Sequence, residues 1–191
     1  MTMADLNLLH KNKELSHLIA FIKKNGERRV IHKKEFFIRA GVYHDEIAYV
    51  LRGGFKFFIQ DYRGKEQIMS FSFDHELVAC YLPPRVGSVA LVNVQALEDS
   101  TILVIPLDKL LQEIQIVVAD TVYIHSFVES LSFDLLQKNL SFRRDSPEQR
   151  YLDLLQRVPD ILNRVSIKDI ASYVGVTPET LSRIRSRRAQ K

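Results

Sequence analysis

The chain has 191 residues and a net charge of +4, with 46% hydrophobic and 26% charged residues, as is ordinary for a globular protein of one or two domains. No apolar run is long enough to span a bilayer, and charges interrupt the apolar residues of the N-terminus, so we expect neither a membrane partner nor a secretory signal. The single cysteine, Cys80, cannot form an internal disulfide or a Cys-rich metal site, which indicates a reduced, cytoplasmic protein.

The N-terminal half combines one helical pattern with many short β-rich runs. Residues 4–24 carry leucine and isoleucine at mostly helical spacing, which predicts an amphipathic helix. From about residue 29 to 105, aromatic and β-branched runs alternate with turns. Residues 55–73 are the clearest case, because two such runs flank DYRGKE and predict a hairpin with Gly64 at its turn. Further strands are predicted at 36–39, 47–51, 89–96 and 101–105, a rhythm that is typical of a sandwich or jelly-roll barrel.

Helical periodicity returns from Leu107 to about Phe142. Its apolar residues step alternately by three and four, which is a heptad-like seam suited to a dimer interface. An amphipathic helix packed on its own β domain would show the same pattern, and periodicity alone favours neither interpretation. The seam consists of Ile114, Val117, Thr121, Ile124, Val128, Leu131 and Leu135.

Three helix starts follow in the last fifty residues or so. Ser146-Pro147-Glu148-Gln149 offers a cap, a proline in the first turn and a Gln able to close a capping box. Ser166 offers a second cap, and Thr177-Pro178-Glu179 repeats the order of cap, proline and acid. These signals predict helices at about 147–157, 167–173 and 178–188, with a short turn at 159–162.

The last two helices have the pattern of a helix-turn-helix. Ala171 stands where two crossing helices approach closely, and Gly175 stands where the turn needs a positive φ. The apolar residues are spaced to share a small core. The core residues are Ile170, Val174, Val176, Leu181 and Ile184.

The last helix also carries the positive charge of the chain. Residues 183–191 hold five basic and no acidic side chains, while the other residues hold 22 basic and 23 acidic ones. Localised positive charge indicates a polyanionic partner. Double-stranded DNA fits, because Arg183 can bind guanine bidentately and Glu179 can accept from cytosine. The two residues are also spaced to pair with each other. The other predicted DNA contacts are Thr177, Thr180, Ser182, Arg185, Arg187 and Arg188.

Two stretches carry a resemblance to a known family. QRYLDLLQRVPDIL (149–162) and VSIKDIASYVGVTPETLSRIRSR (165–187) resemble the C-terminal part of the Crp/Fnr family of bacterial transcription regulators. FFIRAGVYHDEIAYVLRGGFKFF (36–58) resembles the β-roll of that family more loosely. The resemblance covers nearly the whole chain and is sharpest at the C-terminus.

The resemblance implies an α+β architecture in three parts. An N-terminal cyclic-nucleotide-binding-like jelly-roll domain, with its N-terminal helix, would span 1–106. A connecting helix at 107–144 would form a homodimer, and a small all-α helix-turn-helix domain without an evident wing would span 145–191. Glu179 and Arg183 fall on the family's base-reading positions, whereas Pro178 replaces a residue that is polar or basic in many members. RNA polymerase is a further partner by this resemblance.

An effector pocket is only partly matched. Members that bind cyclic nucleotides have a Gly-Glu-Leu step and, about ten residues later, a Pro-Arg-Ser/Thr-Ala step. Glu76 and Arg85 are the corresponding candidates here, but His75 precedes Glu76, and Val-Gly follows Arg85. We therefore expect no cofactor. The effector is unknown or there is none, and we do not expect cyclic AMP to bind in the usual way.

Two other functions compete with the DNA-binding regulator. One is a small-molecule-binding or interaction module whose helix-turn-helix no longer reads DNA. The other is a cupin-like metalloenzyme, since His44 and Glu46 are spaced as two ligands on one strand face. The remaining ligands of the cupin motif are not at their expected positions, so we predict no metal site and no enzyme activity.

Overall fold

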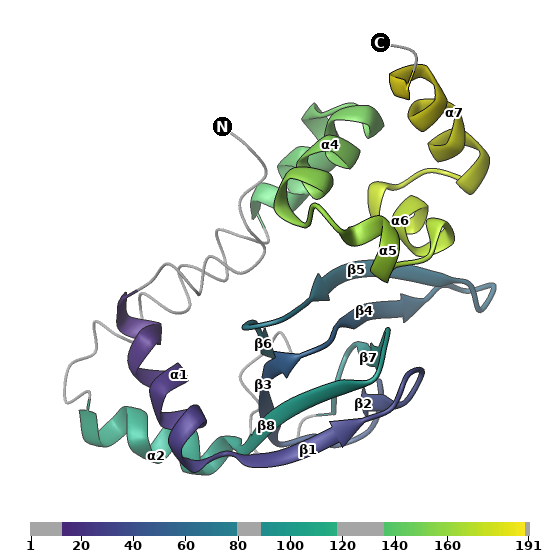
Figure 1. The fold of residues 1–191 in the computed structure, drawn as a ribbon. Coiled ribbons are helices and arrows are strands. Elements are labelled where there is room, and N and C mark those ends of the chain that lie inside the picture. Colours follow the sequence, from purple (N-terminus) through teal and green to yellow (C-terminus); the bar gives the residue numbers. More distant parts are fainter. Residues whose placement is uncertain (1–12, 80–88, 118–135, 190–191) are drawn as a thin grey trace.

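The computed structural model describes residues 13–79, 89–117 and 136–189 of the chain (Figure 1). Strands occupy one half of the molecule in Figure 1, and the C-terminal helices lie over one of the sheets. The predicted N-terminal helix is present as α1 (Lys13–Asn25), and its first part falls outside the described residues.

The described strands form two antiparallel four-stranded sheets, in the orders β1-β8-β3-β6 and β2-β7-β4-β5. This is a β-roll, as the strand rhythm predicts. The strand predicted at 89–96 is shorter than expected, and only its second half forms β7. Val89 makes an isolated bridge to Tyr43. The strands are β1 (Glu27–Ile31), β2 (Phe36–Ile38), β3 (Glu46–Arg52), β4 (Phe55–Gln60), β5 (Glu66–Ser72), β6 (Leu77–Val78), β7 (Asn93–Ala96) and β8 (Ser100–Pro106).

Two faces of the same strands serve two different cores. Phe57 of β4 lies in the core between the sheets, whereas its neighbour Phe58 lies in a second core that the C-terminal helices share. Alternate side chains of a strand point to opposite faces, so one sheet joins both cores. Helices α1 and α2 (Leu107–Val117) pack with β3 and β8 in a third cluster.

The hairpin predicted around Gly64 joins β4 to β5. Gly64 has a φ of 73°, and its amide donates to the carbonyl of Asp61 (2.9 Å). The Asp61 carboxylate accepts from the amides of Arg63 (2.9 Å) and Lys65 (3.0 Å), which is the usual role of an aspartate that begins a turn. The turn is therefore fixed by its own side chain.

The C-terminal helices begin and end close to the predicted positions. They are α4 (Pro147–Arg157), α5 (Ile161–Arg164), α6 (Ile167–Val174) and α7 (Pro178–Ala189), and residues 136–144 are also helical.

Ser146 and Ser166 cap α4 and α6 through the amides of Gln149 and Asp169, as predicted. The Gln149 side chain donates through Nε2 to Asp153 (2.8 Å), and its ability to close a capping box through its oxygen stays a prediction. The segment predicted as a turn at 159–162 leads into the short helix α5.

The predicted dimer seam and the predicted domain boundaries both stay predictions. Residues 118–135, which hold most of the seam, lie outside the described residues. Among the described residues, side-chain packing continues across the predicted divisions at 106 and 144. The C-terminal helices and the sheet β2-β7-β4-β5 share one hydrophobic cluster, which includes Phe71, Tyr173 and Ile170.

Of the glycines in the described residues, Gly53 has the least room for a side chain. Its φ is 118°, and a Cβ there would lie 2.2 Å from Oγ and 2.6 Å from Cα of Ser100. Its amide also donates to the Asp74 carboxylate (3.0 Å). An L side chain is therefore excluded by both the backbone conformation and the neighbouring strand.

We expect Gly53→Ala to lower the free energy of unfolding by about 2–4 kcal/mol, from backbone strain and overpacking together. Gly41→Ala is the matched control, since its φ is 79° and nothing lies within 4 Å of the added Cβ. It should lose only about 1 kcal/mol. Urea unfolding of both variants measures the difference, and equal losses would show that the approach to Ser100 does not require glycine.

Candidate nucleic-acid interface

The pair α6–α7 is joined by a left-handed glycine. Gly175 has a φ of 81°, and its amide donates back to the carbonyls of Ala171 and Ser172. A Cβ at Gly175 would lie 2.8 Å from the ring of Phe142, which is exposed and can shift, so it is the left-handed backbone of the turn that requires glycine. Arg150 of α4 donates to the carbonyl of Val174 (2.8 Å) at the end of α6, which satisfies a free helix carbonyl.

The predicted core of this pair is confirmed. Ala171 is fully buried, as expected for the point where the two helices approach. Val176 is partly buried and packs against the same cluster. The remaining predicted core residues are all buried: Ile170, Val174, Leu181 and Ile184.

The first turn of α7 presents hydrogen-bonding groups to solvent. The Thr177 hydroxyl accepts from the amide of Thr180 (3.3 Å), which confirms the predicted cap. The pKa of Glu179 is lowered, chiefly by a hydrogen bond from its own amide, then by the Thr177 hydroxyl and the charge of Arg183. Glu179 is exposed, so its carboxylate is an ionised acceptor at neutral pH.

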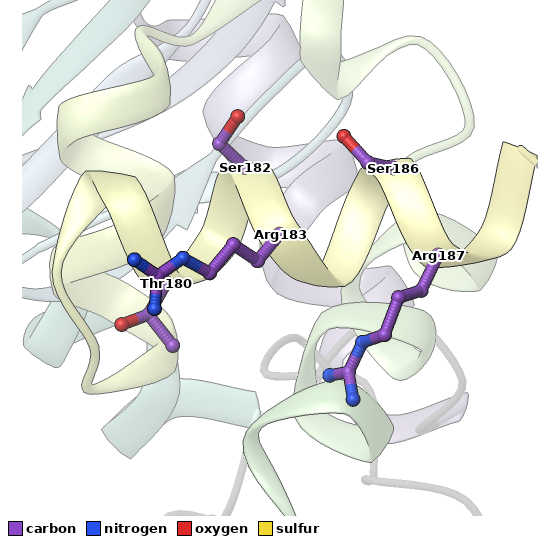
Figure 2. A pocket seen from close by; sticks show the side chains of 5 residues that line it. All are labelled: Thr180, Ser182, Arg183, Ser186 and Arg187. Carbon is purple, nitrogen blue, oxygen red and sulfur yellow. The ribbon is translucent and has the colours of Figure 1, made fainter.

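One face of α7 is polar, positive and open to solvent. Figure 2 shows Arg183 and Arg187 extending along one side of the helix, with Ser182 and Ser186 along the other edge. These residues and Thr180 line an open pocket. Ser186 is the one member that sequence analysis missed, although it lies four residues after Ser182 and so shares its face.

The remaining predicted contacts are also on the surface. Arg185 and Arg188 are exposed on α7, as are the other predicted DNA-binding residues. Arg187 lies 4.0 Å from Glu148 of α4, and both side chains are exposed. The structure thus brings the whole predicted set onto one short helix and its cap.

The pair α6–α7 does not stand free of the β-roll. The Ser172 hydroxyl of α6 accepts from the amide of Ile68 (2.9 Å) and donates to the carbonyl of Glu66 (3.2 Å), so α6 is joined to the start of β5. The ring of Tyr173 packs on that of Phe71, with 5.3 Å between centroids. Polar and apolar contacts together fix the direction in which α7 points.

Arg164 of α5 makes the most extensive polar contact between the helices and the β-roll. Its guanidinium lies 2.7 Å from Asp74 and 2.6 Å from Glu98, and it donates to the carbonyl of Gly53 (2.8 Å). It also lies over the ring of Phe73, 4.5 Å from the centroid. Burial tends to raise the pKa of Asp74, but hydrogen bonds from the Gly53 amide and from Arg164 outweigh it and lower that pKa.

The comparisons with known proteins agree with this architecture. Residues 28–116 match the cyclic nucleotide-binding domain family. The chain therefore carries a cyclic nucleotide-binding domain. No curated protein matches the chain.

Solved structures extend the likeness to the C-terminal helices. FixK2 from Bradyrhizobium japonicum has a TM-score of 0.69 at 18% identity, over 85% of this chain and 83% of FixK2. The c-di-GMP-responsive global regulator CLP from Xanthomonas campestris has a TM-score of 0.66 at 15% identity, over 92% of both chains. A protein from Eubacterium rectale assigned to the Crp/Fnr family has a TM-score of 0.62 at 16% identity, over 96% of this chain and 87% of that one. The resemblance to Crp/Fnr regulators is thus confirmed at the level of the fold.

The cyclic nucleotide-binding domain does not present Glu76 as a free ligand. The Glu76 carboxylate accepts from the amide of Phe73 (2.8 Å) and lies 3.6 Å from Arg157 of α4, which also donates to the carbonyl of Phe71 (3.0 Å). Arg85, the other predicted effector residue, lies outside the described residues. Their role in effector binding stays a prediction. Sequence analysis missed Arg157 and Arg164, whose only signal is their spacing of seven residues.

The geometry of the cyclic nucleotide-binding domain argues against the alternative metal site. The Glu46 carboxylate is held by both guanidinium nitrogens of Arg29 (2.8 Å each), whose hydrogen bonds lower the pKa of Glu46. Burial lowers the pKa of His44, which packs edge-on against Phe37. Within the described residues, no three His, Cys, Asp or Glu side chains gather as a metal site. No described helix is long and apolar enough to cross a membrane.

We expect Arg164→Ala to lower the free energy of unfolding by about 2 kcal/mol, because it leaves two carboxylates without their cation. Water reaches both carboxylates, which keeps the loss below that of a fully buried pair. Arg164→Lys should recover only part of it, since an ammonium cannot reach three acceptors as the planar fork does. Urea unfolding measures the effect.

The control for this prediction is Arg187→Ala, which removes the partner of Glu148 in a pair whose two side chains are both exposed. It should change the stability little, as is typical of surface pairs. If both variants lost the same stability, Arg164 would contribute no more than a surface ion pair.

Proposed function

We propose that this chain is a DNA-binding transcription regulator and not an enzyme, with α7 as the recognition helix of a helix-turn-helix. The observation that carries the proposal is the exposed face of α7, which combines an ionised acceptor at its start with arginines along its length. A helix in the major groove needs such groups to read base edges and bind phosphates. The shared fold with Crp/Fnr regulators supports the same function.

In this proposal each side chain has a distinct part. Arg183 binds guanine bidentately, and Glu179 accepts from a cytosine amino group. Thr180 and Ser182 flank them and contact either bases or backbone. Thr177 already caps the helix, so it acts by placing the free amides of the first turn toward a phosphate. The phosphate contacts along the groove come from Arg185, Arg187 and Arg188.

The functional unit is a homodimer formed through residues 107–144. Two copies of α7 on a twofold axis read a near-palindromic site with half-sites about one helical turn apart. RNA polymerase is the further partner expected of such a regulator. The apolar seam of the sequence supports the dimer. A dimer is also needed for selective binding, because each half-site alone offers too few base contacts.

We expect Arg183→Ala to weaken binding by about 1–3 kcal/mol for each half-site, which is roughly 5- to 150-fold in Kd per half-site, and to relax one base position in each. Selection from random duplexes followed by fluorescence anisotropy measures both effects. Arg28→Ala is the control, because Arg28 is exposed on β1, away from α7 (Figure 1).

The proposal is rejected if selection yields no palindrome and Arg183→Ala binds like the parent. Weak binding that is salt-sensitive but independent of sequence would instead favour an interaction module whose helix-turn-helix no longer reads DNA.

We further propose that the cyclic nucleotide-binding domain does not take up cyclic AMP in the usual way. The reason is that the carboxylate of Glu76 is already engaged by the Phe73 amide and by Arg157. Calorimetric titration of the full chain with cyclic AMP should give no saturable heat. Tight binding that disappears in Arg85→Ala would contradict this expectation.

A further inference from the structure

The β4–β5 turn of the cyclic nucleotide-binding domain lies beside the start of α7. Ser172 holds the backbone of Glu66 and Ile68, so the first residues of β5 are fixed three residues before the Gly175 turn. In Figure 1 the β4–β5 loop projects on the same side of the molecule as the beginning of α7. The charge of Lys65 also acts on the carboxylate of Glu179, as expected of neighbours.

The turn is rigid without any external partner. Besides accepting from two amides of the turn, the Asp61 carboxylate accepts from the side chain of Gln67 (2.9 Å). The Asp61 amide donates to the carbonyl of Lys65 (3.0 Å), which closes the base of the loop. A loop held in this way loses little conformational entropy when it binds a partner.

The side chains at the tip of the turn are positively charged. Arg63 and Lys65 are exposed, and the neighbouring carboxylates are engaged elsewhere, Asp61 with the turn and Glu66 with Lys56. The guanidinium of Arg63 lies 5.0 Å from the ring centroid of Tyr62, which is 88% exposed. An exposed Arg–Tyr pair on a rigid loop is typical of an interaction surface.

We propose that this turn is a second DNA contact, in which Arg63 and Lys65 bind phosphates beside the base pairs that α7 reads. The inference rests on the proposed function. The major groove is about 12 Å wide, so the sugar-phosphate strands run along both sides of a helix that enters it. A fixed positive turn beside the first residues of α7 meets one of these strands, and Glu179 stays free to face the bases.

The side chains of this turn carry no sequence information, which separates them from α7. Contacts to phosphate raise affinity and its dependence on salt, whereas contacts to base edges discriminate between sequences. The turn therefore contributes equally on matched and mismatched sites. It also ties the affinity for DNA to the position of the cyclic nucleotide-binding domain.

The test is the double variant Arg63→Ala/Lys65→Ala in the full chain, with duplexes that carry the selected site. Fluorescence anisotropy between about 50 and 200 mM salt gives the slope of log K against log salt. We expect the slope to become shallower by about 3.6, because the two protomers together lose four phosphate contacts, each of which accounts for about 0.9. The preference for the selected site over a mismatched duplex should not change.

The matched control is Lys24→Ala/Arg28→Ala, which removes the same charge from exposed positions near α1, away from α7 (Figure 1). Its slope should stay close to that of the parent. Both double variants replace exposed side chains only, so equal thermal midpoints would confirm that neither has lost its fold.

A slope equal to that of the control overturns the inference. If Arg183→Ala still relaxes the sequence preference in that case, the proposed function stands without the second contact. If the Arg183 variant is also unchanged, the proposed function fails as well. Unchanged DNA binding with a loss of transcription in the Arg63/Lys65 variant would assign the turn to a protein partner, and would also overturn the inference.

Discussion

The attachment of α5 and α6 to the sheet β2-β7-β4-β5 is the constraint on which the rest of the structure depends. Arg164 neutralises two carboxylates from separate loops of the β-roll, and the ring contact between Tyr173 and Phe71 closes the apolar side. Neither contact alone would fix the orientation of the helices on the sheet, because an ion pair lets them slide and a ring contact lets them rotate. Together with the hydrogen bonds of Ser172, they join two units that the sequence suggests are separate. One cluster of buried side chains therefore runs through both.

The parts that could be predicted from sequence are those fixed by local chemistry. The caps at Ser146, Ser166 and Thr177 and the glycine at 175 depend only on residues within a few positions, and all four are found as expected. The strand pattern is also local, because alternation and turn residues act within one hairpin. The bond from the Gln149 side chain to Asp153, one helical turn later, is also local, but the sequence offered several partners for this side chain and did not single out Asp153.

The parts that could not be predicted involve residues that choose partners far away in the chain. Arg157 and Arg164 read as ordinary surface arginines of a helical segment, yet they reach Glu76 and Asp74, roughly eighty and ninety positions earlier. The sequence associates Glu76 with an effector motif, and the structure shows that its carboxylate is engaged by α4. Sequence spacing cannot reveal such pairs, since they depend on how the sheet and the helices pack. Sequence analysis did not predict the short helix α5 for the same reason. Its contribution is to position Arg164 against the β-roll.

Arg157 and Arg164 bind the same short turn of the β-roll. Asp74 and Glu76 lie in the connection between β5 and β6, and they hold α5 and α4 respectively. The amide of Gly53 donates to Asp74, and its carbonyl accepts from Arg164. The connection is therefore also held to the end of β3. A displacement of this turn cannot be absorbed by one side chain, since each of its charges has a partner in a different helix. Closely packed elements move as units instead of deforming continuously. The direction of α7, and with it the geometry of its exposed arginines, is therefore set by the β-roll as much as by the α6–α7 turn.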